Sequence, residues 1–277
     1  ARGHDRERAR HRFSQRREAV RGLPQECLSA QHMRGEKIST GVNARDAGLV
    51  LTPTPGLDLA LDYYHIAIDD RIVLSGNFTG PLITQLLAPF GANSARFFTN
   101  AINTRTNGID ATAAYRIAFS TAGDVRLHAG YNNTRTEIVG EVATPPQLAG
   151  LDQVLFDRIE RRRIECGQPR DSLRLGGDWR RDRWGAFVNL GRYGEFCSFT
   201  QNPPDDQTYG AKWLTDFEVS YAFDRNVILA GGAQNLFNVF PDRNTTVNSF
   251  NGIQTFPSQS PFGMNGRALY ARINWKM

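Results

Sequence analysis

A repeated alternation of apolar and polar residues, in short runs joined by tight turns, is the feature that most constrains this chain. Residues 213–223 place Phe217 and Val219 on one side of an extended chain and Glu218 on the other. Residues 109–119 and the C-terminal residues repeat the pattern. Because successive side chains of a β-strand point to opposite faces, the alternation predicts strands that are apolar on one face only.

The tight turns can be tested by register, because facing residues of an antiparallel hairpin have numbers with a constant sum. A sum of 450 around Asp224 pairs Tyr221 with Leu229, and sums of 108, 244 and 363 at three other turns also bring apolar residues together. The predicted pairs are Phe217 with Ala233 (450), Leu51 with Leu57 and Leu49 with Leu59 (108), Phe119 with Val125, Ile117 with Leu127 and Ala113 with Tyr131 (244), and Trp179 with Trp184, Leu175 with Val188 and Leu173 with Leu190 (363).

Nine strands are predicted from these runs, and every second connection between them is long. The strands lie near residues 38–51, 57–73, 106–119, 125–139, 171–180, 183–197, 213–223, 227–238 and 266–277, and the long connections are residues 74–105, 140–170, 198–212 and 239–265. Tight turns at one end and long loops at the other are typical of outer-membrane β-barrels, whose tilted spans need about nine to eleven residues. The sequence therefore predicts an all-β fold: an antiparallel, up-and-down segment of a transmembrane β-barrel with short periplasmic turns and long extracellular loops.

The apolar faces of these strands could meet either lipid or a second sheet. In a membrane barrel the apolar face contacts lipid, the polar face lines a wet lumen, and aromatic residues gather at the two interfaces. Trp179, Trp184 and Trp275 lie beside short turns or the C-terminus, whereas Trp213 lies toward a long loop. This arrangement favours the barrel, while a soluble all-β sandwich with a buried aromatic core stays open as an alternative.

The net charge of +5 is confined to an N-terminal arm. The first 38 residues hold nine Arg and one Lys against five acidic residues, so they carry the whole charge, and the remainder is balanced. We therefore expect no nucleic-acid-binding surface on the folded part, residues 35–277. Residues 1–34 show no strand or helix periodicity and are interpreted as a basic, disordered arm, with a frame or junction artefact and a functional RNA- or lipid-binding arm as the alternatives.

The C-terminal third carries the most specific motifs. Gly-Gly-Ala-Gln-Asn-Leu-Phe at 231–237 leads into Asn-Val-Phe-Pro-Asp-Arg at 238–243, and Ser-Pro-Phe-Gly at 260–263 comes before a final alternating strand. This combination closely resembles the last two strands of TonB-dependent outer-membrane receptors. Upstream runs such as Leu-Phe-Asp-Arg at 155–158 are similar to the same barrel, so the resemblance covers about residues 35–277.

The resemblance implies a barrel of about twenty-two strands that is closed by an N-terminal plug and surrounded by outer-membrane lipid in a Gram-negative bacterium. It implies uptake of a scarce small-molecule nutrient, most often a ferric siderophore, energised by the TonB complex through a plug that these nine strands lack. It also implies that the barrel-assembly machinery reads the strand Leu269 to Met277, where Met277 stands in place of the usual Phe. We expect a fragment that does not transport alone; a passive porin and a soluble all-β ligand-binding module are the alternatives.

No pattern of catalytic or metal-binding residues stands out. The five His residues lack the Cys, Asp or Glu neighbours of a triad or a ligand set, and the sequence holds neither a phosphate-binding Gly loop nor a metalloprotease motif. Asp69-Asp70 and Asp205-Asp206 could offer oxygen ligands to a hard cation but are interpreted as solvated loop acids. An enzyme is therefore not expected, and neither a metal site nor a cofactor is predicted.

Ligand binding is expected on the long loops, where aromatic and cationic residues gather. Such residues suit an anionic, aromatic-rich chelate, although they could instead pack the loops against one another. The candidates are Arg96, Phe97, Phe98, Arg158, Arg162, Phe250, Phe256 and Phe262, of which Arg158 and Arg162 lie in a helix-like run over 152–165.

Cys166 and Cys197 are candidates for a disulfide. Their numbers also sum to 363, so an extension of the hairpin around residues 181–182 would place them opposite each other. Export to the periplasm would favour oxidation of the pair. Gly167 and Pro169 could instead end the ladder first, so the pairing stays open.

Overall fold

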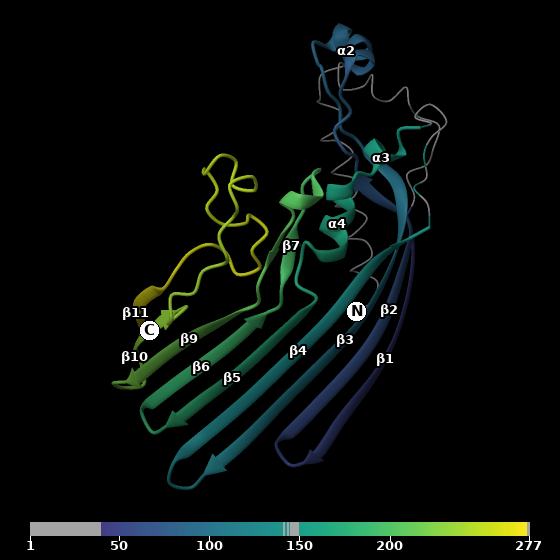
Figure 1. Ribbon diagram of the computed structural model, residues 1–277. Coiled ribbons are helices and arrows are strands. Elements are labelled where there is room, and N and C mark those ends of the chain that lie inside the picture. Colours follow the sequence, from purple (N-terminus) through teal and green to yellow (C-terminus); the bar gives the residue numbers. More distant parts are fainter. Residues whose placement is uncertain (1–39, 141, 143, 145–149, 276–277) are drawn as a thin grey trace. The chain divides into compact units, whose positions relative to one another are not determined.

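The computed structural model describes residues 40–140, 142, 144 and 150–275. Nine strands form one sheet in the order β1-β2-β3-β4-β5-β6-β9-β10-β11, and every neighbouring pair is antiparallel. Their bounds are β1 (Gly41–Thr54), β2 (Leu57–Leu74), β3 (Phe98–Phe119), β4 (Gly123–Val139), β5 (Asp171–Arg181), β6 (Trp184–Tyr193), β9 (Lys212–Ala222), β10 (Val227–Gln234) and β11 (Ala268–Trp275). Figure 1 shows the short turns at one end of the sheet and the long connections at the other.

The long connections contain structure of their own. Helix α3 (Asp152–Leu155) and helix α4 (Arg158–Cys166) lie between β4 and β5, and a small hairpin of β7 (Phe196–Ser198) and β8 (Gln207–Tyr209) extends the connection between β6 and β9. A 3-10 turn, η5 (Pro203–Asp205), closes this hairpin. None of the described helices is long and apolar enough to span a membrane.

Residues 79–95 belong to a separate compact unit, which contains helix α2 (Pro81–Leu87) and the 3-10 turn η3 (Ala88–Phe90). Pro81 occupies the start of α2, where its missing N–H costs no hydrogen bond. Gly91 ends the unit's helical part in a left-handed conformation, and its N–H donates to the Ala88 carbonyl at 3.1 Å. Residues 74–105 were predicted to be one loop, so this helix was not predicted.

All nine predicted strands are present, although β3 begins at Phe98 rather than near 106, β6 ends at Tyr193 rather than near 197, and β10 ends at Gln234 rather than near 238. One of the four predicted registers is correct. β9 and β10 pair Tyr221 with Leu229 and Phe217 with Ala233, as the sum of 450 requires. The other three registers are wrong by two residues: the observed sums are 110 for β1–β2, 242 for β3–β4 and 365 for β5–β6. The observed apolar pairs are Leu49 with Leu61, Leu51 with Leu59, Ile117 with Val125, Tyr115 with Leu127, Ala111 with Tyr131 and Leu175 with Leu190.

The turns explain these shifts. Moving a register by two residues leaves every side chain on its original face, so apolar pairing alone cannot distinguish the two alignments. Between β5 and β6 the turn residues are Asp182 and Arg183, and Asp182 has a φ of 50°. Asp tolerates this left-handed conformation, which suits the twist of a two-residue hairpin turn. Between β3 and β4, Gly123 supplies a positive φ of 88° at the end of the turn.

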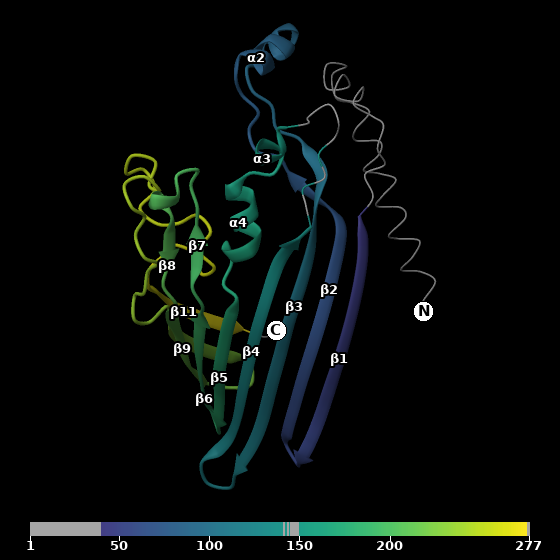
Figure 2. The same ribbon diagram turned by 45° about the vertical axis from the view of Figure 1, so that its right-hand side comes forward.

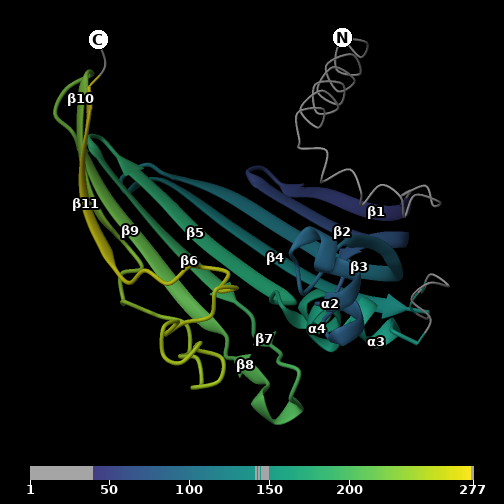
Figure 3. The same ribbon diagram turned by 90° about the horizontal axis from the view of Figure 1, so that it is seen from above.

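One face of the sheet is apolar and exposed. Odd-numbered residues supply this face on every strand of the sheet except β6. Facing residues of β6 and its two neighbours have numbers with an odd sum, so on β6 the even-numbered residues supply it. Its exposed apolar side chains include Leu49, Leu61, Ile109, Tyr131, Leu175, Val188, Phe217, Leu229 and Ile273. Across the described part of the chain the strands follow one curved layer, as Figure 3 shows, and no second sheet covers this face. A soluble sandwich would bury it, so the structure does not support that alternative.

The apolar face becomes polar toward the long connections. On β2 and β3, His65 Nδ1 lies 2.7 Å from Asn107 Oδ1, and Arg105 forms an ion pair with Asp69 at 2.9 Å. β3 has 22 residues, about twice the length that a tilted span needs. The long strands therefore continue beyond the apolar band, and these polar residues mark where the band ends.

The opposite face carries hydrogen-bonded polar side chains. Asn132 donates to Asp110 at 2.6 Å, and Tyr270 donates to Glu218 at 2.9 Å. Gly108 lies directly across from Tyr64, and a Cβ at this position would collide with the tyrosine ring. The glycine thus lets the Tyr64 ring lie flat against the neighbouring strand. A polar face beside an apolar one is the pattern of a barrel wall between lipid and a wet lumen.

Candidate ligand-binding site on the long connections

Helices α3 and α4 divide the run that the sequence analysis expected to be one helix over 152–165. The break falls at Phe156, whose backbone is not helical, and Asp157 then caps α4 by accepting a hydrogen bond from the Glu160 N–H at 2.9 Å. An Asp at this position satisfies a free backbone donor and complements the positive end of the helix dipole. Figure 2 shows α4 beside β7, where the hairpin of β7 and β8 rises beyond β6 and β9.

A disulfide joins Cys166, the last residue of α4, to Cys197 in β7. The two α-carbons are 5.6 Å apart, within the usual range for a disulfide. The two cysteines do not, however, face each other across an extended β5–β6 hairpin, so the register prediction for this pair is wrong. β7 pairs with β8 and not with an extension of β5, so the cysteines meet across a helix end and a strand rather than across one hairpin.

An ion pair reinforces the same junction. Arg158 donates to both carboxylate oxygens of Asp206 and to the Thr200 carbonyl, the latter at 2.6 Å. Hydrogen bonding to Arg158 lowers the pKa of Asp206 below its ordinary value. The Arg158 guanidinium also lies 5.0 Å from the ring centre of Phe199, and that of Arg162 lies 5.2 Å from it. Two of the predicted cations therefore hold one aromatic ring in place.

Arg96, Phe97 and Phe98 lie near the start of β3. Arg96 forms an ion pair with Glu160 at 2.8 Å and donates to the Ser75 carbonyl at 3.0 Å. Phe97 stacks on Phe78 with ring centres 5.4 Å apart. Phe98 was expected in a loop, but it is the first residue of β3 and pairs with Leu74; its ring remains 68% exposed.

The three predicted phenylalanines of the connection between β10 and β11 have different surroundings. Phe256 stacks on Phe240 with ring centres 5.5 Å apart. Phe262 packs against Tyr193 with ring centres 5.4 Å apart. Phe250 instead lines a cavity and is 69% exposed. The structure thus brings Phe250 alone among the eight candidates directly into this cavity, while Arg158 and Arg162 support its wall through Phe199.

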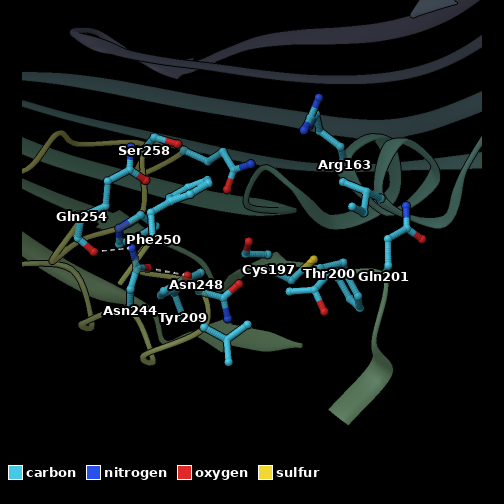
Figure 4. A pocket seen from close by; sticks show the side chains of 16 residues that line it. Arg163, Cys197, Thr200, Gln201, Tyr209, Asn244, Asn248, Phe250, Gln254 and Ser258 are labelled. Carbon is cyan, nitrogen blue, oxygen red and sulfur yellow. Dashed lines mark hydrogen bonds between the residues drawn. The ribbon is translucent and has the colours of Figure 1, made fainter. Parts of the chain in front are cut away.

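The cavity has a volume of about 390 Å³ and lies between α4, the β7–β8 hairpin and the connection that follows β10. This size falls in the range of small-molecule sites. Figure 4 shows Phe250, Gln254 and Ser258 along one side, and Arg163 and Gln201 along the other.

Tyr209 and Asn244 form the floor of the cavity. The Tyr209 side chain is buried and stacks on Phe196 with ring centres 4.8 Å apart. Burial raises the pKa of the Tyr209 hydroxyl, which donates to Asn244 Oδ1 at 2.7 Å. Asn244 Nδ2 in turn donates to the Gln254 carbonyl at 2.9 Å, so this network fixes the backbone beside Phe250.

Sequence reasoning missed most of the cavity. Its lining residues include Phe199, Thr200, Gln201, Tyr209, Asn244, Asn248, Gln254 and Ser258. These eight residues come from two connections that have no repeating pattern, and amide or hydroxyl side chains in loops are common enough to give no signal of their own. The disulfide was the one sequence feature that could have indicated which connections meet.

The chain is similar to known proteins in sequence and in fold. Residues 40–236 match the family described as TonB dependent receptor-like, beta-barrel. The ferric-catecholate import receptor Fiu from K12 E. coli has a similar structure, with a TM-score of 0.54 and 14% identity over 87% of this chain and 29% of that one. The pyoverdine outer membrane receptor FpvA from Pseudomonas aeruginosa PAO1 gives a TM-score of 0.52 and 13% identity, over 85% of this chain and 30% of that one.

The copper transporter OprC gives a TM-score of 0.53 and 16% identity over 86% of this chain and 32% of its own. The chain therefore spans about a third or less of these structures, and at such identities the likeness shows the fold. No curated protein shows significant sequence similarity to the chain. The family match covers well over half of the sequence and agrees with the antiparallel, one-sided sheet, so the chain belongs to the TonB-dependent receptor β-barrel family.

Proposed function

We propose that this chain forms part of the barrel wall and the extracellular loops of an outer-membrane receptor in a Gram-negative bacterium. The receptor would take up a scarce nutrient, with a ferric siderophore as the first candidate, and TonB would supply the energy through a plug domain. Membership of the family supports this proposal, since its members are receptors and transporters rather than enzymes. Two structural neighbours are named as receptors for pyoverdine and for ferric catecholates.

The observation that carries the proposal is the sheet with one apolar and one polar face. β1 and β11 each pair on one side only among the described residues, so the sheet is open. An open edge in lipid leaves backbone groups without hydrogen bonds, which is costly. We therefore propose that residues 35–277 are adjacent strands of a larger closed barrel, and that the barrel-assembly machinery reads the strand from Leu269 to Met277, whose last two residues lie outside the described part. The basic arm, residues 1–34, also lies outside it.

The eight candidate residues would divide into three roles in ligand capture. Phe250 would contact the ligand, because it is exposed in the cavity. Arg158 and Arg162 would act by holding Phe199 in the cavity wall. Arg96, Phe97, Phe98, Phe256 and Phe262 would shape the connections around the cavity, because they lie against other parts of the chain or at a strand end.

Energised uptake by cells tests the proposed function. The complete receptor that contains this sequence would be expressed in a strain lacking its other iron receptors, and accumulation of radiolabelled ferric siderophores would be followed with and without a protonophore. We expect accumulation that stops when the protonophore is added or when TonB is deleted. Uptake that continues under both conditions would indicate a passive porin instead, and a folded receptor that is extracted without detergent would indicate a soluble binding module.

A further inference from the structure

The cavity between α4, β7–β8 and the connection after β10 is lined mainly by uncharged polar groups. Arg163 is the one charged side chain among its lining residues. The Arg163 guanidinium donates to both carboxylate oxygens of Glu160, each at 2.9 Å. The Glu160 carboxylate also accepts a hydrogen bond from Arg96 at 2.8 Å. The charge that faces the cavity is thus already partnered within the protein.

The two arginines that hold Phe199 in the cavity wall are partnered too. Arg158 is held by Asp206, and Arg162 forms an ion pair with Glu165 at 3.2 Å. A strongly anionic ligand is bound best by free guanidinium groups that form new charge-assisted hydrogen bonds. Binding such a ligand here would require breaking existing ion pairs. The cavity is therefore better suited to a neutral ligand than to the anionic chelate that the sequence suggested.

Several polar groups of the lining are free to bind a ligand. Among the described residues, the side-chain amides of Gln254 and Gln259 and the hydroxyl of Ser258 have no hydrogen-bond partner. The backbone that carries Gln254 is nevertheless fixed, because its N–H donates to the Ser249 carbonyl at 2.8 Å and its carbonyl accepts from Asn244. An amide offers two donors and one acceptor, which suits hydroxyl groups that both donate and accept.

Phe250 adds an apolar surface beside these polar groups. Its ring is 69% exposed, and Ser249, the preceding residue, is buried and donates through its hydroxyl to the Thr246 carbonyl at 2.7 Å. The face of an aromatic ring carries partial negative charge and attracts weakly positive C–H groups. An exposed aromatic face beside unpartnered amides complements a molecule that has C–H groups on one face and hydroxyls around its edge.

We infer that this cavity binds an uncharged, carbohydrate-type group. The C–H face of the sugar would pack on Phe250, and its hydroxyls would bond to Gln254, Gln259 and Ser258. The inference rests on the proposed function, because the group would belong to the nutrient that the receptor captures. It extends that function by assigning the chemical class that the cavity recognises.

Calorimetry on the complete receptor in nanodiscs tests the inference. The probes are three neutral oligosaccharides with different linkages, maltohexaose, cellohexaose and chitohexaose, and one anionic ferric tris-catecholate complex. We expect at least one neutral oligosaccharide to bind, with an affinity that stays the same within about twofold between 0.05 and 0.5 M salt, because no charge pairing is involved. We expect Phe250→Ala to weaken binding about tenfold and Gln254→Ala about fivefold.

Phe237→Ala is the matched control, since Phe237 is almost equally exposed but lies outside the cavity lining. It should leave sugar affinity unchanged. The inference is wrong if none of the three oligosaccharides binds, or if their binding survives both cavity substitutions. Energised uptake of the ferric complex without sugar binding would overturn this inference alone, whereas sugar binding without energised uptake of any probe would overturn the proposed function alone.

Discussion

An arginine placed on the apolar face of β6 should destabilise the receptor far more than one placed on the polar face at the same depth. Val188 and Asn189 are consecutive and exposed, and they lie on opposite faces of the sheet. Val188 lies four residues along β6 from Trp184, which begins the strand at the short-turn end. At about 3.3 Å per residue and a tilt of about 40°, this distance is roughly 10 Å of depth, close to the middle of an apolar band about 25 Å tall.

The size of the effect follows from that depth. An arginine that faces lipid near the bilayer midplane costs about 2–4 kcal/mol, which is about 30- to 700-fold in the folding equilibrium. Asn189→Arg should change the free energy of unfolding by less than about 1 kcal/mol, because its side chain would reach the wet face. Val188→Ala controls for the loss of the valine side chain alone.

Urea unfolding in liposomes measures this difference. The folded fraction is followed by heat-modifiable gel mobility, and the free energy of unfolding is extrapolated linearly to zero urea. We expect Val188→Arg to lower the unfolding midpoint well below that of Asn189→Arg and Val188→Ala. Equal midpoints for the two arginine variants would refute the assignment of this face to lipid.

Two further predictions concern the connections around the cavity. The Cys166–Cys197 disulfide joins residues 31 apart in the sequence, so its reduction should lower the stability of this junction by about 2–4 kcal/mol. Proteolysis of the junction should then become faster, while the sheet stays protected from the protease. Unchanged proteolysis would contradict this. Hydrogen bonding to Arg158 lowers the pKa of Asp206, so the pair stabilises the junction above the ordinary carboxyl pKa of about 3.9 and loses this contribution as the pH falls through the lower folded-state value. Hydrogen exchange of residues 199–206 should therefore accelerate at acidic pH in the native receptor, and in Asp206→Asn it should be fast and nearly independent of pH once corrected for intrinsic exchange.

The sheet was predictable because its signal repeats along the chain. Period-two alternation depends only on which face meets lipid, and it specified all nine strands. It could not choose between registers two residues apart, since both keep Leu49 and Leu51 on the same face. The choice was made locally, by turn residues such as Asp182 and Gly123 that adopt a positive φ.

The cavity was largely unpredictable for the opposite reason. Tyr209, Asn244 and Gln254 are brought together by single hydrogen bonds between distant connections, and nothing periodic in the sequence encodes these contacts. Arg158 and Arg162 attracted notice as cations, but the sequence could not show that Asp206 and Glu165 already partner them. The partners of the disulfide were identified, although a helix end rather than a hairpin brings them together.

Spin labels on two adjacent alanines of β3 test most directly whether the apolar face meets hydrocarbon. Ala113 lies on the apolar face and Ala114 on the polar face, and both are half-buried within the same strand. Ala113→Cys and Ala114→Cys would be labelled in the complete receptor in liposomes, and collision rates with oxygen and with a water-soluble nickel complex would be measured. The account predicts that the label at 113 collides mainly with oxygen and the label at 114 mainly with nickel. Equal accessibility at the two positions, or the reverse order, would contradict it.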